Sequence, residues 1–133
     1  MFVPTLVEVP PRIPLGHYVD QRVPVLDQGQ EGACTGYALA TVVHYLLARR
    51  SIEPDRQAVS PRMLYEMARR YDEWPGENYD GSSARGAMKG WHKHGVCAED
   101  DWPSQPARKA GGLDEARVTA ARRRPLGAYF RVN

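Results

Sequence analysis

The sequence has no long hydrophobic run. None of its 133 residues belongs to an uninterrupted stretch of about 18 apolar residues, so no segment predicts a transmembrane helix. The first residues also lack the basic region and the apolar core of a secretory signal peptide. We therefore expect a cytoplasmic protein without a membrane partner.

Cysteine is scarce as well. Only Cys34 and Cys97 are present, which excludes the dense disulfide framework of small secreted domains. A single Cys34–Cys97 disulfide stays open at this point. Otherwise Cys97, which follows Gly95 and Val96, is expected to be a packed or partly exposed thiol with no role in chemistry.

An excess of charge of one sign is also missing. The chain carries 18 Lys and Arg against 16 Asp and Glu, a net charge of +2 that favours neither nucleic acid nor a membrane surface. The charges are uneven along the chain, because residues 105–133 hold 7 basic and 2 acidic side chains. The run Arg122–Arg124 is most simply the solvated end of a helix. A nucleic-acid patch is the alternative, but it lacks interleaved aromatic residues, and we predict no nucleic-acid partner.

The sequence does contain enough apolar residues for one globular domain. Hydrophobic residues make up 42%, and a chain of this size buries roughly two thirds of its unfolded surface on folding. Five of the 11 prolines lie in residues 1–30, where each removes a backbone donor and favours extended geometry. We therefore predict an extended arm over residues 1–30.

A broad apolar stripe predicts a central, mostly buried helix from Cys34 to about Arg50. Its members follow the i, i+3, i+4, i+7 spacing of one helix face. They are Leu39, Val42, Val43 and Leu46.

Local capping signals predict three further helices. Ser60 followed by Pro61 is typical of a helix start. A third helix is expected from Ser82 or Ser83 to His94, with Gly95 as its C-terminal cap, and Asp114 begins a short last helix.

Two further features of the chain predict tertiary contacts. In the third helix, Gly86 and Gly90 are four residues apart and would permit close approach of another element. Residues 126–132 have the composition of a β-strand, which would need a partner strand to satisfy its backbone.

The chemically interesting segment is the turn before the central helix. A glycine-rich stretch delivers Cys34 to the first helical turn, where the positive end of the helix favours the nucleophilic thiolate. Gln28 lies six residues earlier, so its side-chain amide and the Cys34 backbone N–H would form a two-donor oxyanion hole. Taken alone, however, a cysteine at this place is more often an inert buried residue.

The longer string around Cys34 resembles the papain-like cysteine peptidases. Their signature around the nucleophile is C-G-[SA]-C-[WY], and residues 31–35 agree at three of five positions. Gln28 stands where the family keeps its oxyanion glutamine. Residues 60–64, 79–83 and 95–103 are similar to the family's second helix, its peptide-pairing loop and its G-[VI]-x(n)-[YW]-P segment. The likeness runs from about Val23 to the C-terminus and is closest to bacterial members.

The resemblance implies an α+β fold. Residues 31–124 would form the helical lobe of a papain-like protein, whose long central helix carries Cys34. Residues 1–30 would provide the arm and the oxyanion turn. Residues 125–133 would be the first strand of the β-barrel of a second lobe.

The resemblance also implies the roles of the site residues. Cys34 would be the catalytic nucleophile and Gln28 the oxyanion donor. The substrate-binding residues would be Gly32, Asp80, Gly81 and Ser82, acting mainly through their backbone. No metal and no cofactor are implied.

Three departures from the family pattern stand out. Glu31 occupies the place of a disulfide cysteine of secreted members, which fits a reduced compartment. Thr35 replaces the aromatic residue that follows the nucleophile. The histidine base and orienting Asn are expected about 130–150 residues after the cysteine, which is beyond Asn133.

None of the four histidines of the chain suits the role of the base. His44 lies ten residues along the same helix, about 15 Å from Cys34, and the others are expected at the surface: His17, His92 and His94. The base matters because a papain-type cysteine has a pKa about 5 units below that of a free thiol, roughly 7 kcal/mol, whereas a helix terminus supplies at most about 2 kcal/mol.

The sequence therefore predicts the nucleophile half of a papain-like cysteine peptidase. It would hydrolyse peptides or proteins through a thioester once a second chain or a missing C-terminal segment supplies the His and Asn. Two alternatives remain: an inactive papain-like interaction module, and a papain-fold acyltransferase or transamidase.

Overall fold

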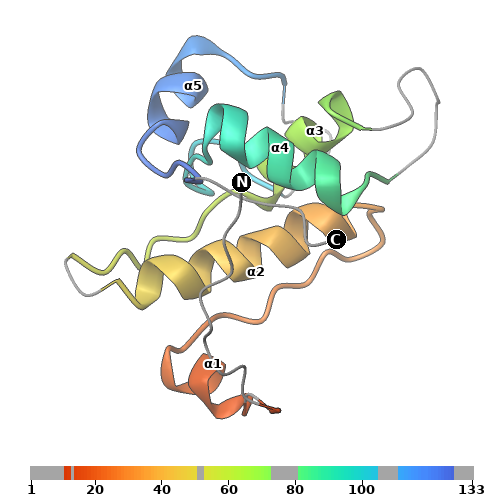
Figure 1. Cartoon of the computed structure of the whole chain (residues 1–133). Helices are drawn as coiled ribbons and strands as arrows, with labels where there is room; N and C mark the ends of the chain where they lie inside the picture. The colour runs from red at the N-terminus through yellow and green to blue at the C-terminus, as the bar shows by residue number, and fades with distance from the viewer. Residues whose placement is uncertain (1–10, 13, 51–52, 73–80, 105–110, 128–133) are drawn as a thin grey trace, which may run out of the picture.

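The computed structural model describes residues 11–12, 14–50, 53–72, 81–104 and 111–127. Over these ranges the chain folds as the helices α1 (Gly16–Asp20), α2 (Cys34–Ala48), α3 (Pro61–Arg70), α4 (Ala84–His94) and α5 (Glu115–Ala121). Figure 1 shows α4 above α2, with α1 set apart below them and α5 on the side away from α1. No helix in these ranges is both long and apolar enough to cross a membrane.

The predicted α+β fold with a β-barrel strand is wrong, because the described part of the chain is helical. Its only extended pairing is one antiparallel bridge between Val59 and Ala98. Residues 125–127 form no strand, while 128–133 lie outside the described ranges. The preceding Arg124 carbonyl accepts from the Val96 N–H at 3.2 Å and from the Trp91 indole N–H at 3.0 Å. The Arg124 carbonyl is thus held at the end of α4, and the described ranges provide no partner strand for residues 125–127.

Three helices enclose the main core, since α3 packs against both α2 and α4. Glycines make this close packing possible, as the spacing of Gly86 and Gly90 predicted. A Cβ atom on Gly90 would lie 2.7 Å from the Met67 Cβ, and one on Gly86 would lie 2.7 Å from the Ala68 carbonyl oxygen. The core residues are Leu39, Ala40, Val43, Val59, Leu64, Ala68, Ala87, Trp91 and Val96.

The buried face of α2 differs from the predicted stripe. Leu39 and Val43 are buried, but Val42 and Leu46 are 47% and 42% exposed. Gly36 also lies on the buried side of α2, where a Cβ would lie 2.5 Å from the Pro61 carbonyl oxygen of α3. The approach of α3 along Gly36 therefore sets the rotation of α2.

The predicted helix caps are confirmed. Ser60, Ser83 and Asp114 accept from the backbone N–H three residues later, at 3.0, 2.9 and 2.8 Å. Gly95 ends α4 with a φ of 76°. These local bonds fix where α3, α4 and α5 begin or end.

The arm is less extended than predicted, because residues 16–20 form the short helix α1. The Tyr18 ring packs on the Tyr45 ring of α2 with centroids 4.6 Å apart. Arg56 also donates to the Gln21 carbonyl at 2.8 Å. Consequently α1 lies beside the second half of α2, well away from Cys34.

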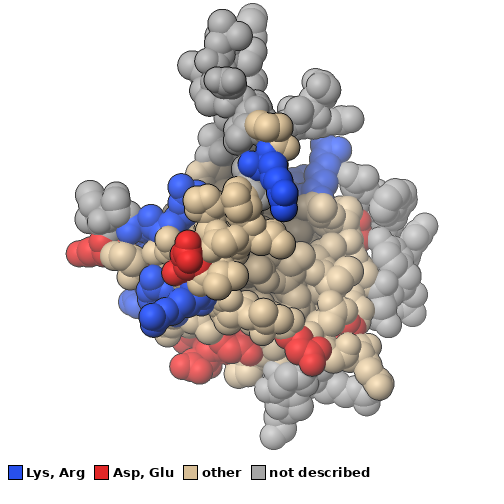
Figure 2. All heavy atoms as spheres, turned by 90° about the horizontal axis from the view of Figure 1, so that it is seen from below, with Lys and Arg blue, Asp and Glu red and all other residues tan. Residues whose placement is uncertain are grey.

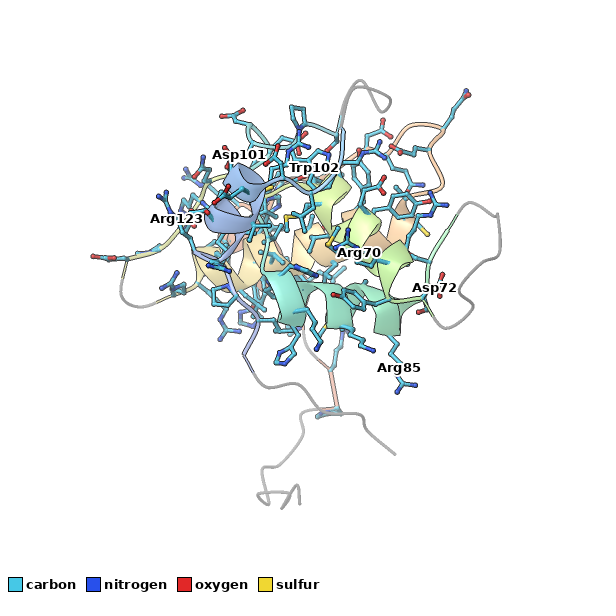
Figure 3. All side chains as sticks on the ribbon, turned by 90° about the horizontal axis from the view of Figure 1, so that it is seen from above. Arg70, Asp72, Arg85, Asp101, Trp102 and Arg123 are labelled. Atoms are coloured by element: carbon cyan, nitrogen blue, oxygen red, sulfur yellow. The ribbon has the colours of Figure 1, made fainter. Side chains whose placement is uncertain are left out.

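A second, smaller core lies under α5. It contains Met63, Cys97, Trp102 and Ala121. The Arg117 guanidinium covers the Trp102 ring at 4.4 Å from its centroid, and Figure 3 shows Trp102 beside α5. Ser60, the cap of α3, donates from its hydroxyl to the Trp102 carbonyl at 2.6 Å. This cluster therefore anchors the start of α3.

Candidate active site

Cys34 is the first residue of α2, and its thiol is exposed. The alternative that Cys34 is a buried cysteine is therefore wrong. Both thiols of the chain are free, so the Cys34–Cys97 disulfide is absent. The preceding Ala33 provides no side-chain cap, which leaves the first N–H groups of α2 without a competing side-chain oxygen.

Cys97 has the properties expected of a packed thiol. It is fully buried, and burial raises its pKa to about 11. The Cys97 thiol therefore stays protonated at neutral pH and is a poor nucleophile.

The turn before α2 is held by its own hydrogen bonds. Gly29 adopts a left-handed φ of 62°, and its N–H donates to the Asp27 carboxylate at 2.8 Å. The Glu31 carbonyl then accepts twice, from the Ala33 N–H at 2.8 Å and from the Gln28 side-chain Nε2 at 2.6 Å. The Gln28 amide is thereby fixed to the loop that delivers Cys34.

An ion pair ties this turn to α3. The carboxylate of Glu31 pairs with the guanidinium of Arg62, a side chain that is only 5% exposed. Arg62 also lies 3.3 Å from Glu66, one turn further along α3. The Glu31–Arg62 pair was not predicted from the sequence, in which only the i, i+4 spacing of Arg62 and Glu66 indicates an ion pair.

The loop that precedes α4 reaches the same place. The Ser82 and Thr35 hydroxyls are hydrogen-bonded to each other, which joins this loop to the first turn of α2. The Gly81 N–H donates to the Tyr65 hydroxyl at 3.0 Å. The structure therefore brings Gly81 and Ser82 next to the nucleophile segment. Asp80 lies outside the described residues, and Gly32 is exposed in the turn.

These bonds restrict how the loop can bind a peptide. Because the Gly81 N–H is already used by Tyr65, any pairing of this residue with a substrate backbone would involve its carbonyl group. The Ser82 hydroxyl is likewise engaged by Thr35.

No histidine of this chain is placed to act on Cys34. The Nε2 atom of His44 is engaged elsewhere, because it accepts a hydrogen bond from the Val59 N–H at 2.9 Å. His94 is bonded to the Tyr71 hydroxyl at 2.7 Å, and His92 contacts the Gly127 carbonyl. His17 is part of α1, beside the second half of α2. A base for Cys34 must therefore come from outside these four side chains.

His44 is a buried neutral imidazole. Because its Nε2 accepts a hydrogen bond, its proton lies on Nδ1, which has no partner among the described residues. Burial lowers the pKa of His44, and the nearby Asp55 carboxylate opposes this effect only in part. The folded protein therefore binds this proton less readily than the unfolded chain does.

Stability is consequently expected to fall as the pH drops below about 6.5, the usual histidine pKa. One such group contributes a slope of at most ~1.4 kcal/mol per pH unit. Urea unfolding at pH 7, 6 and 5 gives the unfolding free energy at each pH. The dependence of this free energy on pH should be weaker in His44→Gln than in the wild type, whereas the exposed control His92→Gln should leave it unchanged. Equal slopes for the wild type and His44→Gln would contradict this account.

No group of three or more His, Cys, Asp or Glu side chains suited to hold a metal ion occurs in the described ranges. The arrangement offers an exposed thiol at a helix start, preceded by a turn whose Gln28 carboxamide is bonded to its own backbone.

Comparison with known proteins agrees with this geometry. No family model and no curated protein sequence matches the chain. Among solved structures it is similar to xylellain, a cysteine protease from Xylella fastidiosa, with a TM-score of 0.64 and 28% sequence identity. The match covers 82% of this chain and 45% of that one, so the chain spans less than half the length of xylellain. The described helices thus share their fold with part of a bacterial cysteine protease.

Proposed function

We propose that this chain is the nucleophile-bearing N-terminal half of a papain-like cysteine peptidase. One observation carries the proposal: an exposed thiol begins α2, and the amide of Gln28 is held on the turn just before it. The likeness to a bacterial cysteine protease supports it. Residues 31–124 are the helical lobe in this proposal, and residues 1–30 are the arm and the oxyanion turn.

The reaction is acyl transfer through the sulfur. The Cys34 thiolate attacks a peptide carbonyl, and a C–S bond forms while the C–N bond breaks. The second Gln28 side-chain N–H, which has no partner among the described residues, and the Cys34 backbone N–H hold the oxyanion. The leaving amine takes a proton from the base, and water then cleaves the thioester to release the acid and restore the thiol.

The base and its orienting Asn come from a second chain or a further segment. The surface of α2 supports this part of the proposal, since Ala38, Val42 and Leu46 continue the exposed line that starts at Cys34. Residues four apart share one helix face, and a helix that is apolar all round is usually buried. Figure 2, seen from the side on which α1 lies, shows a broad uncharged centre with charged groups around it. A second body covering α2 would place an imidazole beside Cys34.

The substrate is a peptide or protein bound beside the turn. Gly32 leaves room for its backbone, and Asp80, Gly81 and Ser82 line the non-primed side. A reducing compartment such as the cytoplasm suits the free thiol at Cys34.

The test compares two samples. The first, called the natural-length protein below, is the protein isolated from its source together with any chain that co-purifies. The second is the 133-residue chain by itself. Under reducing conditions we expect the first sample to hydrolyse a fluorogenic dipeptide amide and to be labelled on Cys34 by a thiol-reactive epoxide. The 133-residue chain should show no hydrolysis, because none of its four histidines is placed to protonate the leaving amine.

Other outcomes would identify the alternatives. Amide product in place of acid, on addition of an amine, would identify a transamidase. Slow, ordinary alkylation of Cys34 in the natural protein, without hydrolysis, would identify an inactive interaction module and contradict the proposal.

A further inference from the structure

Arg62 is a buried cation beside the turn that carries the nucleophile. It lies in the first turn of α3 and is 5% exposed, although arginine is rarely buried. Its two carboxylate partners come from different elements: Glu66 from the same helix and Glu31 from the turn. Burying such a group is costly, and replacing a whole buried cluster of ion pairs by apolar side chains of similar volume is often neutral or stabilising. A positional role explains the arginine better than stability does.

Glu31 connects Arg62 to the oxyanion donor. Its carboxylate is bound to Arg62, whereas its carbonyl accepts from Gln28 Nε2 at 2.6 Å and from the Ala33 N–H at 2.8 Å. One residue therefore joins α3, the Gln28 amide and the residue immediately before Cys34.

This geometry also fixes which end of the Gln28 amide faces which way. A carbonyl can accept only from the nitrogen, so Nε2 must point to Glu31. A carboxamide nitrogen carries two N–H groups. One is used by Glu31, and the second has no partner among the described residues, so it can donate to an oxyanion in a defined orientation.

The support of Arg62 is rigid. Ser60 caps α3 and is anchored to the Trp102 carbonyl, and Gly36 lets the backbones of α2 and α3 approach closely. The guanidinium thus has a defined position relative to the start of α2.

We propose that Arg62 is a positioning residue for the oxyanion hole, acting through Glu31 on Gln28. This inference rests on the proposed function, and Arg62 touches neither the substrate nor the reacting atoms. Catalysis depends on such pre-oriented donors, and removing one costs about 10²–10³-fold in kcat. A donor that is kept but held less firmly should lower kcat by a smaller factor.

The test compares Arg62→Met with the matched control Arg70→Met, in which the arginine lies at the other end of the same helix (Figure 3). In the 133-residue chain, ¹H–¹⁵N NMR follows the Gln28 side-chain amide, assigned with Gln28→Ala. We expect Arg62→Met to shift both amide protons and to lower their heteronuclear NOE to that of a free surface glutamine. Arg70→Met should leave both unchanged.

The second readout is catalysis by the natural-length protein. Arg62→Met should lower kcat about 10–100-fold with KM changed less than about twofold. Arg62→Lys, which keeps a cation at this place, should recover part of kcat. A merely structural role would lower the unfolding free energy and leave the amide signals and kcat intact, which would overturn the proposal.

Glu31→Gln provides a second variant, should Arg62→Met fail to fold. It keeps the carbonyl and removes the ion pair, while Arg62 retains Glu66. We expect Glu31→Gln to lower the heteronuclear NOE of the Gln28 side-chain amide and kcat, each by less than Arg62→Met does. An unaltered Gln28 NOE would overturn the proposal. If no form of the protein hydrolyses peptides, the proposed function fails, and the NMR comparison still decides the role of Arg62.

Discussion

Replacing Cys34 by serine is expected to lower kcat of the natural-length protein for peptide hydrolysis by about 10⁴-fold or more. Removing the nucleophile of a comparable hydrolase costs about 10⁶-fold, and what remains comes from binding and the oxyanion hole. The serine hydroxyl has nearly the same size as the thiol but is far harder to deprotonate. Because Cys34 is exposed at the helix start, the substitution should leave the fold unchanged.

The matched control is Cys97→Ala. Cys97 is buried, and its pKa is raised to about 11, so it should neither react with the epoxide nor contribute to hydrolysis. Mass spectrometry of the labelled protein should find the epoxide on Cys34 alone, in the wild type and in Cys97→Ala. Hydrolysis at the wild-type rate by Cys34→Ser would remove the basis of the proposed mechanism.

The largest effect on stability is expected from Gly95→Ala. Gly95 ends α4 with φ 76° and ψ −161°, a combination that is essentially restricted to glycine. An added Cβ would overlap the Ala121 carbonyl oxygen and lie 2.8 Å from the Ala121 carbonyl carbon. Both atoms belong to the backbone, which cannot move aside as a side chain could.

Strain and overpacking each cost about 1–3 kcal/mol, so we expect a loss of about 3 kcal/mol or more. For a domain of this size the melting temperature should fall by about 10 °C or more. Gly16→Ala is the matched control, since a Cβ there meets nothing within 4 Å. Urea unfolding measures both variants. A loss below about 1 kcal/mol for Gly95→Ala would show that this packing is wrong.

The consequences of Gly95→Ala should extend to the site. The Gly95 N–H donates to the Trp91 carbonyl at 2.7 Å, and two residues later the Cys97 carbonyl accepts from the Ser60 N–H at 2.9 Å. Ser60 is the cap of the helix that carries Arg62. Disturbing the end of α4 therefore disturbs the support of the turn before Cys34.

The predicted helix starts rest on neighbouring residues and agree with the structure. Ser60, Ser83 and Asp114 cap their helices through bonds that span three residues, so the signal is contained in each short segment. The position of Cys34 at a helix start, directly after a glycine-containing turn, was likewise predicted from a short segment.

The predictions that required distant contacts were less accurate. The α2 sequence is apolar all round, so its spacing left several faces available. The close approach of α3 at Gly36 then buried Leu39 and Val43 and left Val42 exposed. Residues 126–132 had strand composition, but the two of them that the structure describes, Leu126 and Gly127, form no strand, and the Arg124 carbonyl just before them is held at the end of α4.

The sequence by itself determined the helix caps, the place of the thiol and the presence of Gln28 six residues before it. Only the tertiary structure decided that Glu31 pairs with Arg62 and that Thr35 bonds Ser82. The physical reason is the distance along the chain. Bonds within one turn form wherever the residues occur, whereas an ion pair between a loop and a later helix forms only after packing has set their separation.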